Sequence, residues 1–153
     1  MMQPTKNNYA RFALMLGTSF VIMYAVMFFN VAQWDHIYLS TMRSYMTTLM
    51  IAPMAITMLL FMRGMYPDKK LNALILGGAL LVGVGIFVAM RQQTAVDDVA
   101  WMRAMISHHS SAILVSEEAA LSDPEVKRLA VEIVEAQRRE IAQMEAMIAR
   151  LND

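Results

Sequence analysis

The chain has no cysteine among its 153 residues, and its formal net charge is zero. The absence of cysteine excludes disulfides and thiolate metal sites, which leaves methionine, histidine and carboxylate side chains as the strong metal ligands. Since the charge is balanced and no run of lysine or arginine occurs, counterion release cannot drive binding to nucleic acid. We therefore expect no nucleic-acid partner, and any metal site must use thioethers, imidazoles and carboxylates.

Long apolar segments, by contrast, are abundant. Hydrophobic residues make up 58% of the chain, and the mean hydropathy is +0.42, which is too apolar for an ordinary water-soluble domain. Three segments, residues 12–32, 44–62 and 71–90, approach the roughly twenty residues that a helix needs to span a bilayer. We predict three transmembrane helices in a domain of residues 1–92, surrounded by membrane lipid. Small residues in the third span, Gly77, Gly78, Gly83 and Gly85, are expected to admit a neighbouring helix.

The positive charges near the spans predict the orientation. Those expected on the cytoplasmic side are Lys6, Arg11, Arg63, Lys69 and Lys70. The other two ends carry only Arg43 and Arg91. Because cytoplasmic loops are enriched in lysine and arginine, we expect a bacterial inner-membrane protein with a cytoplasmic N-terminus and a periplasmic C-terminal third.

A ladder of methionines runs through the second span. Its members, four residues apart, are Met42, Met46, Met50, Met54, Met58 and Met62. Because a step of four residues advances about 40° around a helix, the ladder winds and does not form a straight stripe. Two interpretations remain open, a path for soft metal ions and simple packing by a flexible apolar side chain. Pro53 removes a backbone donor near the middle of the ladder and predicts a kink.

The first loop contains one polar pair, Asp35 and His36. Such a pair is typical of the interface between membrane and water, but it lies close to Met42 on the predicted outer side. We therefore keep Asp35 and His36 as a possible entry site for a metal ion.

Residues 94–153 are charged and amphipathic, and they predict a helical hairpin. Thr94 or Asp97 can cap a first helix that continues to Leu121, and Ser122 or Asp123 can cap a second helix that starts at Pro124. The expected inner stripe of the second helix is Val126, Leu129, Ile133, Gln137, Ile141, Met144, Ile148 and Leu151. Since two helices alone bury little apolar area, we expect an all-α protein whose hairpin forms half of a four-helix, ferritin-like bundle, completed by a homo-oligomer.

A cluster of metal-ligating side chains falls on the hairpin. Met105 lies one turn before both His108 and His109, and Met102 lies seven residues before His109. Reflecting the antiparallel hairpin about its turn adds residues of the second helix, with His109 level with Gln137, Met105 near Glu140 and Met102 near Met144. Imidazole with thioether suits Cu(I) or Ag(I), and the carboxylate and amide could hold Cu(II) or orient the imidazoles. The alternative is a core histidine bonded to Gln137 beside a solvated one.

These residues also carry a resemblance to a known family. They are Asp98, Trp101, Met105, His108, His109, Ala112, Pro124, Ala130, Ile133, Gln137, Glu140, Ile141 and Met144. This pattern resembles the domain-of-unknown-function 305 family, whose members are ferritin-like helical bundles with a Met-x-x-His-His motif, some implicated in periplasmic copper binding and resistance. The resemblance implies Met105, His108 and His109 as metal-site residues, with Gln137, Glu140 and Met144 on the second helix. It also implies a bundle built between chains.

The leading hypothesis is a membrane-anchored protein that binds copper ions for sequestration, delivery or tolerance outside the cytoplasm, with a possible copper-handling partner protein. The alternative is a structural or accessory membrane subunit that docks a partner through its hairpin and binds no metal. A di-metal oxidase would need a Glu-x-x-His motif, which the sequence lacks. No catalytic triad, phosphate loop or paired-carboxylate cleft is identifiable, so we do not expect an enzyme.

Overall fold

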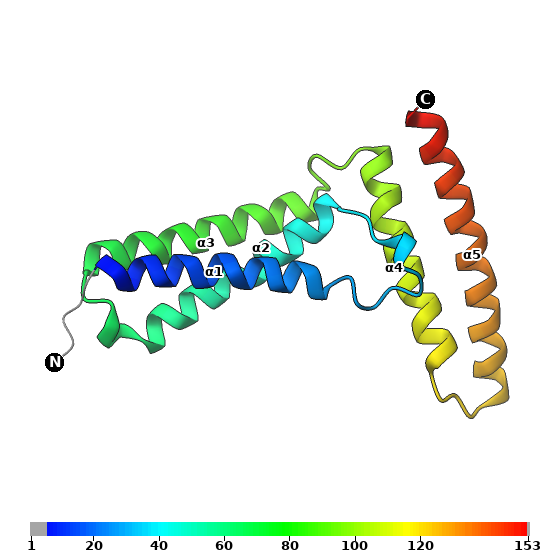
Figure 1. The fold of residues 1–153 in the computed structure, drawn as a ribbon, viewed down its shortest axis with the longest axis horizontal. Coiled ribbons are helices and arrows are strands. Elements are labelled where there is room, and N and C mark those ends of the chain that lie inside the picture. Colours follow the sequence, from blue (N-terminus) through cyan, green and yellow to red (C-terminus); the bar gives the residue numbers. More distant parts are fainter. Residues whose placement is uncertain (1–5, 153) are drawn as a thin grey trace. The chain divides into compact units, whose positions relative to one another are not determined.

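The computed structural model describes residues 6–152; residues 1–5 of the predicted transmembrane domain and residue 153 of the predicted hairpin lie outside this range. The described chain contains long α-helices, which are joined by shorter turns and by a loop of residues 27–40 (Figure 1). The elements are α1 (Lys6–Val26), η1 (Trp34–His36), α2 (Thr41–Phe61), η2 (Arg63–Met65), α3 (Lys69–Arg91), α4 (Asp98–Glu118) and α5 (Pro124–Asn152). No strand occurs in residues 6–152, which confirms the predicted all-α class.

Three of the helices are long and apolar enough to cross a membrane. They are α1, α2 and α3, with apolar stretches Asn8–Val26, Thr41–Phe61 and Lys69–Arg91. The first helix ends at Val26, earlier than the predicted span of residues 12–32, because the chain turns at residues 27–30. In the apolar window of α3, 0% of the residues are buried within the chain, so the described residues leave much of the surface of this helix uncovered.

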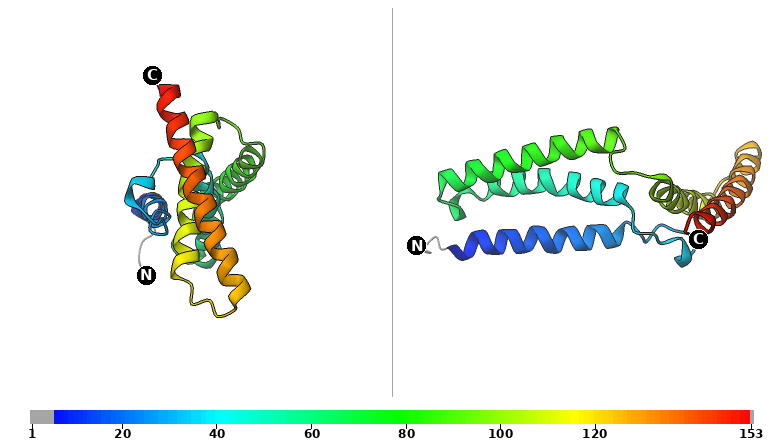
Figure 2. Two further views of the ribbon diagram at one scale, coloured as in Figure 1. Left: turned by 90° about the vertical axis from the view of Figure 1, so that its right-hand side faces the viewer. Right: turned by 90° about the horizontal axis from the view of Figure 1, so that it is seen from above.

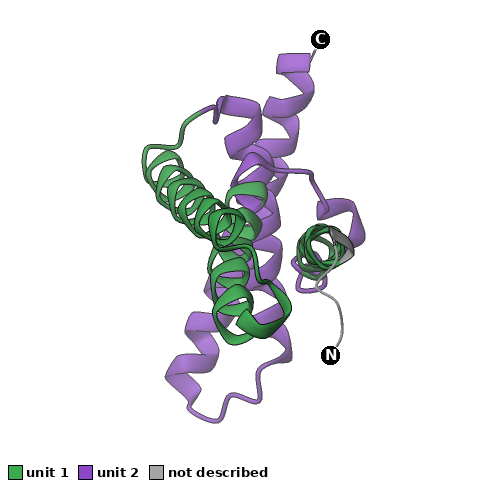
Figure 3. Ribbon diagram, turned by 90° about the vertical axis from the view of Figure 1, so that its left-hand side faces the viewer, with its two compact units in different colours: residues 1–26, 44–94 green, residues 27–43, 95–153 purple. Residues whose placement is uncertain are grey.

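The membrane helices pack around a small core within one compact unit. This unit contains the described residues up to Val26 together with Ser44–Thr94 (green in Figure 3). Its buried cluster joins Phe12 of α1, Ala55 and Leu59 of α2, and Tyr66 after η2. The rings of Phe12 and Tyr66 meet edge to face, with centroids 5.5 Å apart. Side chains of α3 pack against the same cluster, so it connects all three helices.

One glycine of α3 allows a close approach to α2. A Cβ atom built at Gly83 would lie 3.3 Å from the Cβ of Ala52, which is tighter than most contacts of this kind. A Cβ at Gly77, Gly78 or Gly85 would meet no atom of the described residues within 4 Å. Within this unit, Gly83 is therefore the glycine of α3 that accommodates a neighbouring helix.

The second unit joins the hairpin to the loop between α1 and α2. It contains Met27–Arg43 and the described residues from Ala95 onward (purple in Figure 3). The sequence predicts this loop as part of the transmembrane domain of residues 1–92. Serines of α4 account for the grouping, because Ser110 Oγ lies 2.8 Å from both the Ala32 amide nitrogen and His36 Nδ1, and Ser107 Oγ donates a 2.8 Å hydrogen bond to the His36 carbonyl.

Helices α4 and α5 lie side by side and run in opposite directions (Figures 1 and 2). Asp97 caps α4, where its Oδ1 accepts a 2.7 Å hydrogen bond from the Ala100 amide. Asp123 caps α5 in the same way, and Pro124 occupies the first helical position. Both caps were among those predicted. Asp97 marks the start of α4, and Asp123 marks the start of α5.

The core of the hairpin follows only part of the predicted stripe. The buried side chains are Met102, Ile106, Ile113, Ile141, Met144 and Ile148. The prediction was wrong for four residues that are exposed, Val126, Leu129, Ile133 and Leu151. Val134 packs against the core instead of Ile133. The reason is helical spacing, because Val134, Ile141 and Ile148 follow one another at seven residues and therefore share one side of α5.

Candidate metal centre

A groove of about 480 Å³ lies between α4 and α5. Its lining residues are Trp101, Met102, Met105, His109, Glu140, Gln143, Met144 and Met147. The side chains of Met102, His109 and Met144 are buried, and Met105 is partly buried. Met147 lines the same groove and is 37% exposed. The hairpin thus brings four thioethers and one imidazole to a single hollow.

Glu140 holds the ring of His109. The Nε2 atom of His109 lies 2.6 Å from Oε2 of Glu140. Because an ionised carboxylate only accepts hydrogen bonds, this contact places a proton on Nε2. In the neutral ring, the other nitrogen, Nδ1, then carries a free lone pair. Nδ1 is buried and has no hydrogen-bond partner, which is unusual for a buried polar atom.

This arrangement fits the ligation of a soft metal ion. Histidines that bind metals commonly donate their second ring N–H to a carboxylate, which fixes the ring and the tautomer. Thioethers and imidazoles together suit Cu(I) and Ag(I). In the part of the chain that the structure describes, no three histidine or carboxylate side chains form a group that could hold a metal ion. A site in this groove must therefore use sulfur as well as the nitrogen of His109.

Two of the residues predicted for the site do not line the groove. His108 is exposed, and its ring is tilted 64° from the ring of His109, with centroids 6.1 Å apart. Successive residues on a helix point about 100° apart, and here His109 lines the groove while His108 does not. Gln137 is partly buried and lies one turn before Glu140. His109 contacts Glu140. Reflection of the hairpin about its turn predicted instead that His109 would lie level with Gln137.

Three lining residues were not predicted as part of the site, namely Trp101, Gln143 and Met147. Spacing could have identified all three, because Trp101 lies four residues before Met105, Met147 lies three after Met144, and Gln143 lies three after Glu140.

The polar pair of the first loop lies elsewhere in the same unit. His36 is buried and is bonded to Ser110, as described above, while Asp35 is exposed. His36 lines a separate hollow of about 210 Å³, together with Glu117 and Arg138. The latter two form a 2.6 Å ion pair. The structure thus gives His36 a clear role in attaching the loop to α4.

The methionine ladder lies on α2 except for its last member. Met62 follows the helix, and its amide still donates to the Met58 carbonyl at 2.9 Å. Met46, Met50 and Met62 are exposed, whereas Met42 and Met54 are partly buried. Met58 is also partly buried and packs against the core of the membrane helices. The ladder therefore does not share one environment.

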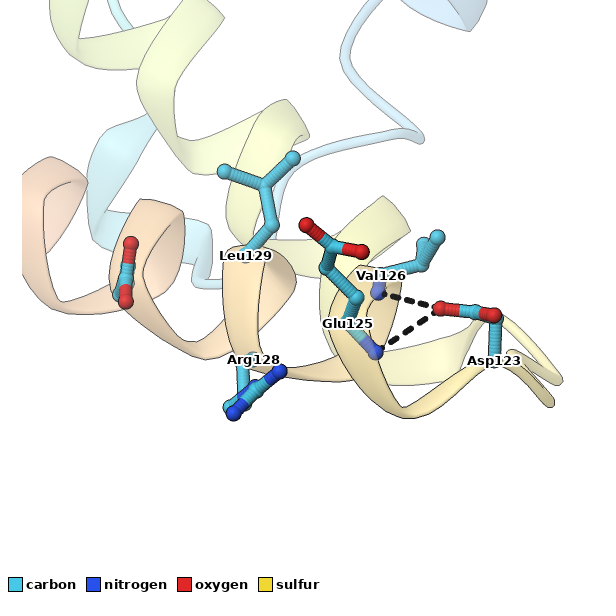
Figure 4. A pocket seen from close by; sticks show the side chains of 6 residues that line it. Asp123, Glu125, Val126, Arg128 and Leu129 are labelled. Atoms are coloured by element: carbon cyan, nitrogen blue, oxygen red, sulfur yellow. Dashed lines mark hydrogen bonds between the residues drawn. The ribbon is translucent and has the colours of Figure 1, made fainter.

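A third hollow, of about 730 Å³, lies at the start of α5. It is lined by Asp123, Glu125, Val126, Arg128, Leu129 and Glu132. Figure 4 shows that the Asp123 carboxylate is engaged in capping, with hydrogen bonds of 2.8 Å and 3.0 Å from the amides of Glu125 and Val126. Apolar and charged side chains alternate here, and no sulfur or imidazole lines the hollow. The groove at His109 is the better candidate for a metal.

Comparison with known proteins places the chain in a family. The family model described as "Domain of unknown function (DUF305)" matches residues 53–148, which is more than half of the chain. The chain belongs to the DUF305 family. The match includes every residue that lines the groove. It also begins within α2, so the DUF305 pattern extends further toward the N-terminus than the last third on which the resemblance was based.

A comparison with curated proteins also finds a relative of this chain. An uncharacterized protein of Acanthamoeba polyphaga mimivirus is 30% identical over 106 residues, which cover 68% of this chain and 68% of the relative. No solved structure matches this DUF305 protein.

Proposed function

We propose that this protein is a membrane-anchored copper-binding protein whose metal site is the groove around His109. The observation that carries the proposal is the state of the His109 ring, with Nε2 bonded to Glu140 and Nδ1 buried without a hydrogen-bond partner, in a residue that lines a groove with four methionines. Nδ1 of His109 and the sulfur atoms of Met102, Met105 and Met144 are the proposed ligands. Glu140 orients the imidazole, and Met147 is an additional thioether at the edge.

The ligand set determines which ion is favoured. Thioethers and a neutral imidazole are soft or intermediate donors, and they hold Cu(I) or Ag(I) without contributing negative charge. Copper outside the cytoplasm meets an oxidising environment in which thiols form disulfides, whereas thioethers are not consumed in this way. The chain has 17 methionines and no cysteine, which suits that environment. His108, Gln137 and His36 lie outside the groove and are secondary candidates.

The proposal includes a location and partners. The three apolar helices support membrane attachment, and the distribution of positive charge supports a bacterial inner membrane with the hairpin on the periplasmic side. The exposed apolar side chains of α5, Val126, Leu129 and Ile133, support self-association through the hairpin into a larger bundle. Sequestration or delivery of copper to a partner protein would then take place outside the cytoplasm.

A competition titration tests the proposal. The full chain in detergent is titrated with Cu(I) in the presence of a chromophoric Cu(I) chelator, and the same is done for His109→Ala and His108→Ala. We expect the wild type and His108→Ala to remove copper from the chelator, and His109→Ala to lose most of this ability. His108→Ala is the matched control, because it removes the neighbouring imidazole outside the groove.

Two results would overturn the proposal. If the wild type takes no Cu(I) from a chelator of micromolar affinity, the chain is better described as a structural or accessory membrane subunit. If His108→Ala loses copper and His109→Ala retains it, a metal site exists but does not lie in the groove.

A further inference from the structure

Trp101 lines the groove, as Gln143 does, without belonging to the proposed ligand set. It lies on the first turns of α4, and it lines the groove with Met102, Met105 and His109. Its side chain is 50% exposed and lies outside the buried cluster of the hairpin. A large aromatic ring that is half exposed on a charged, amphipathic helix has only part of the stabilisation that full burial would give. The stabilisation gained by burying the ring therefore explains little of why a tryptophan occupies position 101.

The helical spacing places the indole beside the proposed ligands. Trp101 precedes Met105 by four residues, so their Cβ atoms are neighbours on one side of α4, about 5–6 Å apart. Met102 and His109, seven residues apart, lie on the adjoining strip of the same helix. Because all of them line one groove, an ion bound by the sulfurs of Met102 and Met105 and by His109 lies within reach of the indole.

The charge of the groove determines what the indole can contribute to the binding of an ion. Thioethers and a neutral imidazole carry no charge, and the carboxylate of Glu140 is engaged with His109 Nε2. This hydrogen bond leaves the negative charge of the Glu140 carboxylate in place, so the carboxylate attracts any bound cation and an aromatic ring can add to that attraction. The face of an indole ring is the most negative of the aromatic side chains, and it attracts a cation that lies over it. Thioethers with an imidazole suit Cu(I) and Ag(I), whereas Zn²⁺ prefers thiolate, imidazole and carboxylate ligands, so a soft ion is the one that lies among the sulfurs beside the indole.

We propose that the face of Trp101 contacts the bound ion and makes the groove selective for soft monovalent cations, Cu(I) and Ag(I). This inference rests on the proposed metal site. It adds a cation–π contact to that site and specifies that the bound ion is monovalent. Zn²⁺ prefers nitrogen and oxygen ligands to thioethers, so it would be held at His109 and Glu140 and not among the sulfurs beside Trp101.

Fluorescence with Ag(I) provides the test, because Ag(I) is not oxidised during the titration. The chain has two tryptophans, and Trp34 is 74% exposed, so Trp34→Phe leaves Trp101 as the single reporter with little disturbance. Ag(I) retained by the protein is measured in parallel by equilibrium dialysis. We expect one equivalent of Ag(I) to quench the Trp101 emission, and Zn²⁺ to leave it unchanged.

Substitution of Trp101 measures the contribution of the ring. We expect Trp101→Leu to weaken Ag(I) retention by roughly three- to tenfold, the range expected for a partly desolvated cation–π contact. Trp101→Phe should retain part of the wild-type affinity because its ring has a weaker face. Helix content, measured by circular dichroism, shows whether each variant keeps the fold.

The outcomes separate this inference from the proposed function. Retention of Ag(I) with wild-type affinity by Trp101→Leu, together with unchanged Trp101 emission, would overturn the contact and leave the metal site in place. An equal emission change with Zn²⁺ would overturn the selectivity. If the wild type retains no Ag(I), both the metal site and the contact are wrong.

Discussion

At the scale of single residues, the decisive feature is that the two ring nitrogens of His109 have different surroundings. One nitrogen is bonded to an exposed carboxylate, and the other is buried without a partner. The two nitrogens of a histidine are coupled, because the bond made by one determines what the other can do. In the proposed function, His109 acts as a ligand through Nδ1, and Glu140 positions its ring.

Removal of this carboxylate should weaken metal binding without removing a ligand. We predict that Glu140→Ala lowers the Cu(I) affinity by roughly 10- to 100-fold, the usual cost of losing the partner of a ligating histidine. The Glu140 side chain is 54% exposed, so its loss should cost little stability. Glu132→Ala removes the same charge from α5 at a site outside the groove and is the control. Equal affinities for both variants in the chelator competition would contradict the role of Glu140.

At the scale of elements, the loop between α1 and α2 is attached to α4 through buried serines. Ser110 serves both the Ala32 amide and His36, and it is fully buried. Ser111 makes one exposed bond, which Asn30 Nδ2 donates. A buried group that loses its partner costs more than an exposed one, because water cannot replace the bond.

We therefore predict that Ser110→Ala destabilises the attachment of the loop, by about 1–3 kcal/mol for each buried group left without a partner. Hydrogen exchange at the Ala32 amide should become faster in this variant. Ser111→Ala should leave the exchange rate close to that of the wild type. Slow exchange at Ala32 in Ser110→Ala would show that other contacts hold the loop.

The close approach of α2 and α3 at Gly83 gives a second prediction at this scale. Gly83→Leu places a side chain where even a Cβ atom would lie 3.3 Å from Ala52, and overpacking of this kind costs about 1–3 kcal/mol. Gly85→Leu is the matched control, because a Cβ there meets no atom of the described residues within 4 Å. Thermal unfolding in detergent should occur at a lower temperature for Gly83→Leu than for Gly85→Leu. The reverse order would contradict the packing described here.

The sequence predicted the elements better than their contacts. Apolar length identified the three long helices, and the Asp97 and Asp123 caps followed from simple rules, because these features depend on neighbouring residues. The pairing of His109 with Glu140 rather than Gln137 depends on the register of two helices. A reflection about the turn cannot fix that register to within one turn. The bonds to Ser107 and Ser110 join distant segments and leave no periodic signal.

At the scale of the whole molecule, the orientation in the membrane remains a prediction from charge. The chain has no cysteine, so a single introduced cysteine reports its own accessibility. We predict that Ser122→Cys, in the exposed hairpin turn, reacts with a membrane-impermeant maleimide in intact cells. Gly64→Cys, in the exposed turn between α2 and α3, should react only after permeabilisation. The opposite pattern would place the hairpin in the cytoplasm.

The methionine ladder has a smaller role in this account than its regularity suggests. Its members wind around α2 and lie in different environments, and Met58 belongs to the core of the membrane helices. The groove on the hairpin combines sulfur with an available imidazole nitrogen, which the ladder lacks. The central claim is therefore that copper is bound by thioethers and by His109.

X-ray absorption spectroscopy of the Cu(I)-loaded full chain tests this claim most directly, because it identifies the atoms bound to the metal. We predict a coordination shell dominated by sulfur, with a single nitrogen and the scattering pattern of one imidazole, and the loss of that pattern in His109→Ala. A shell made only of oxygen and nitrogen atoms, or one unchanged by His109→Ala, would contradict the account.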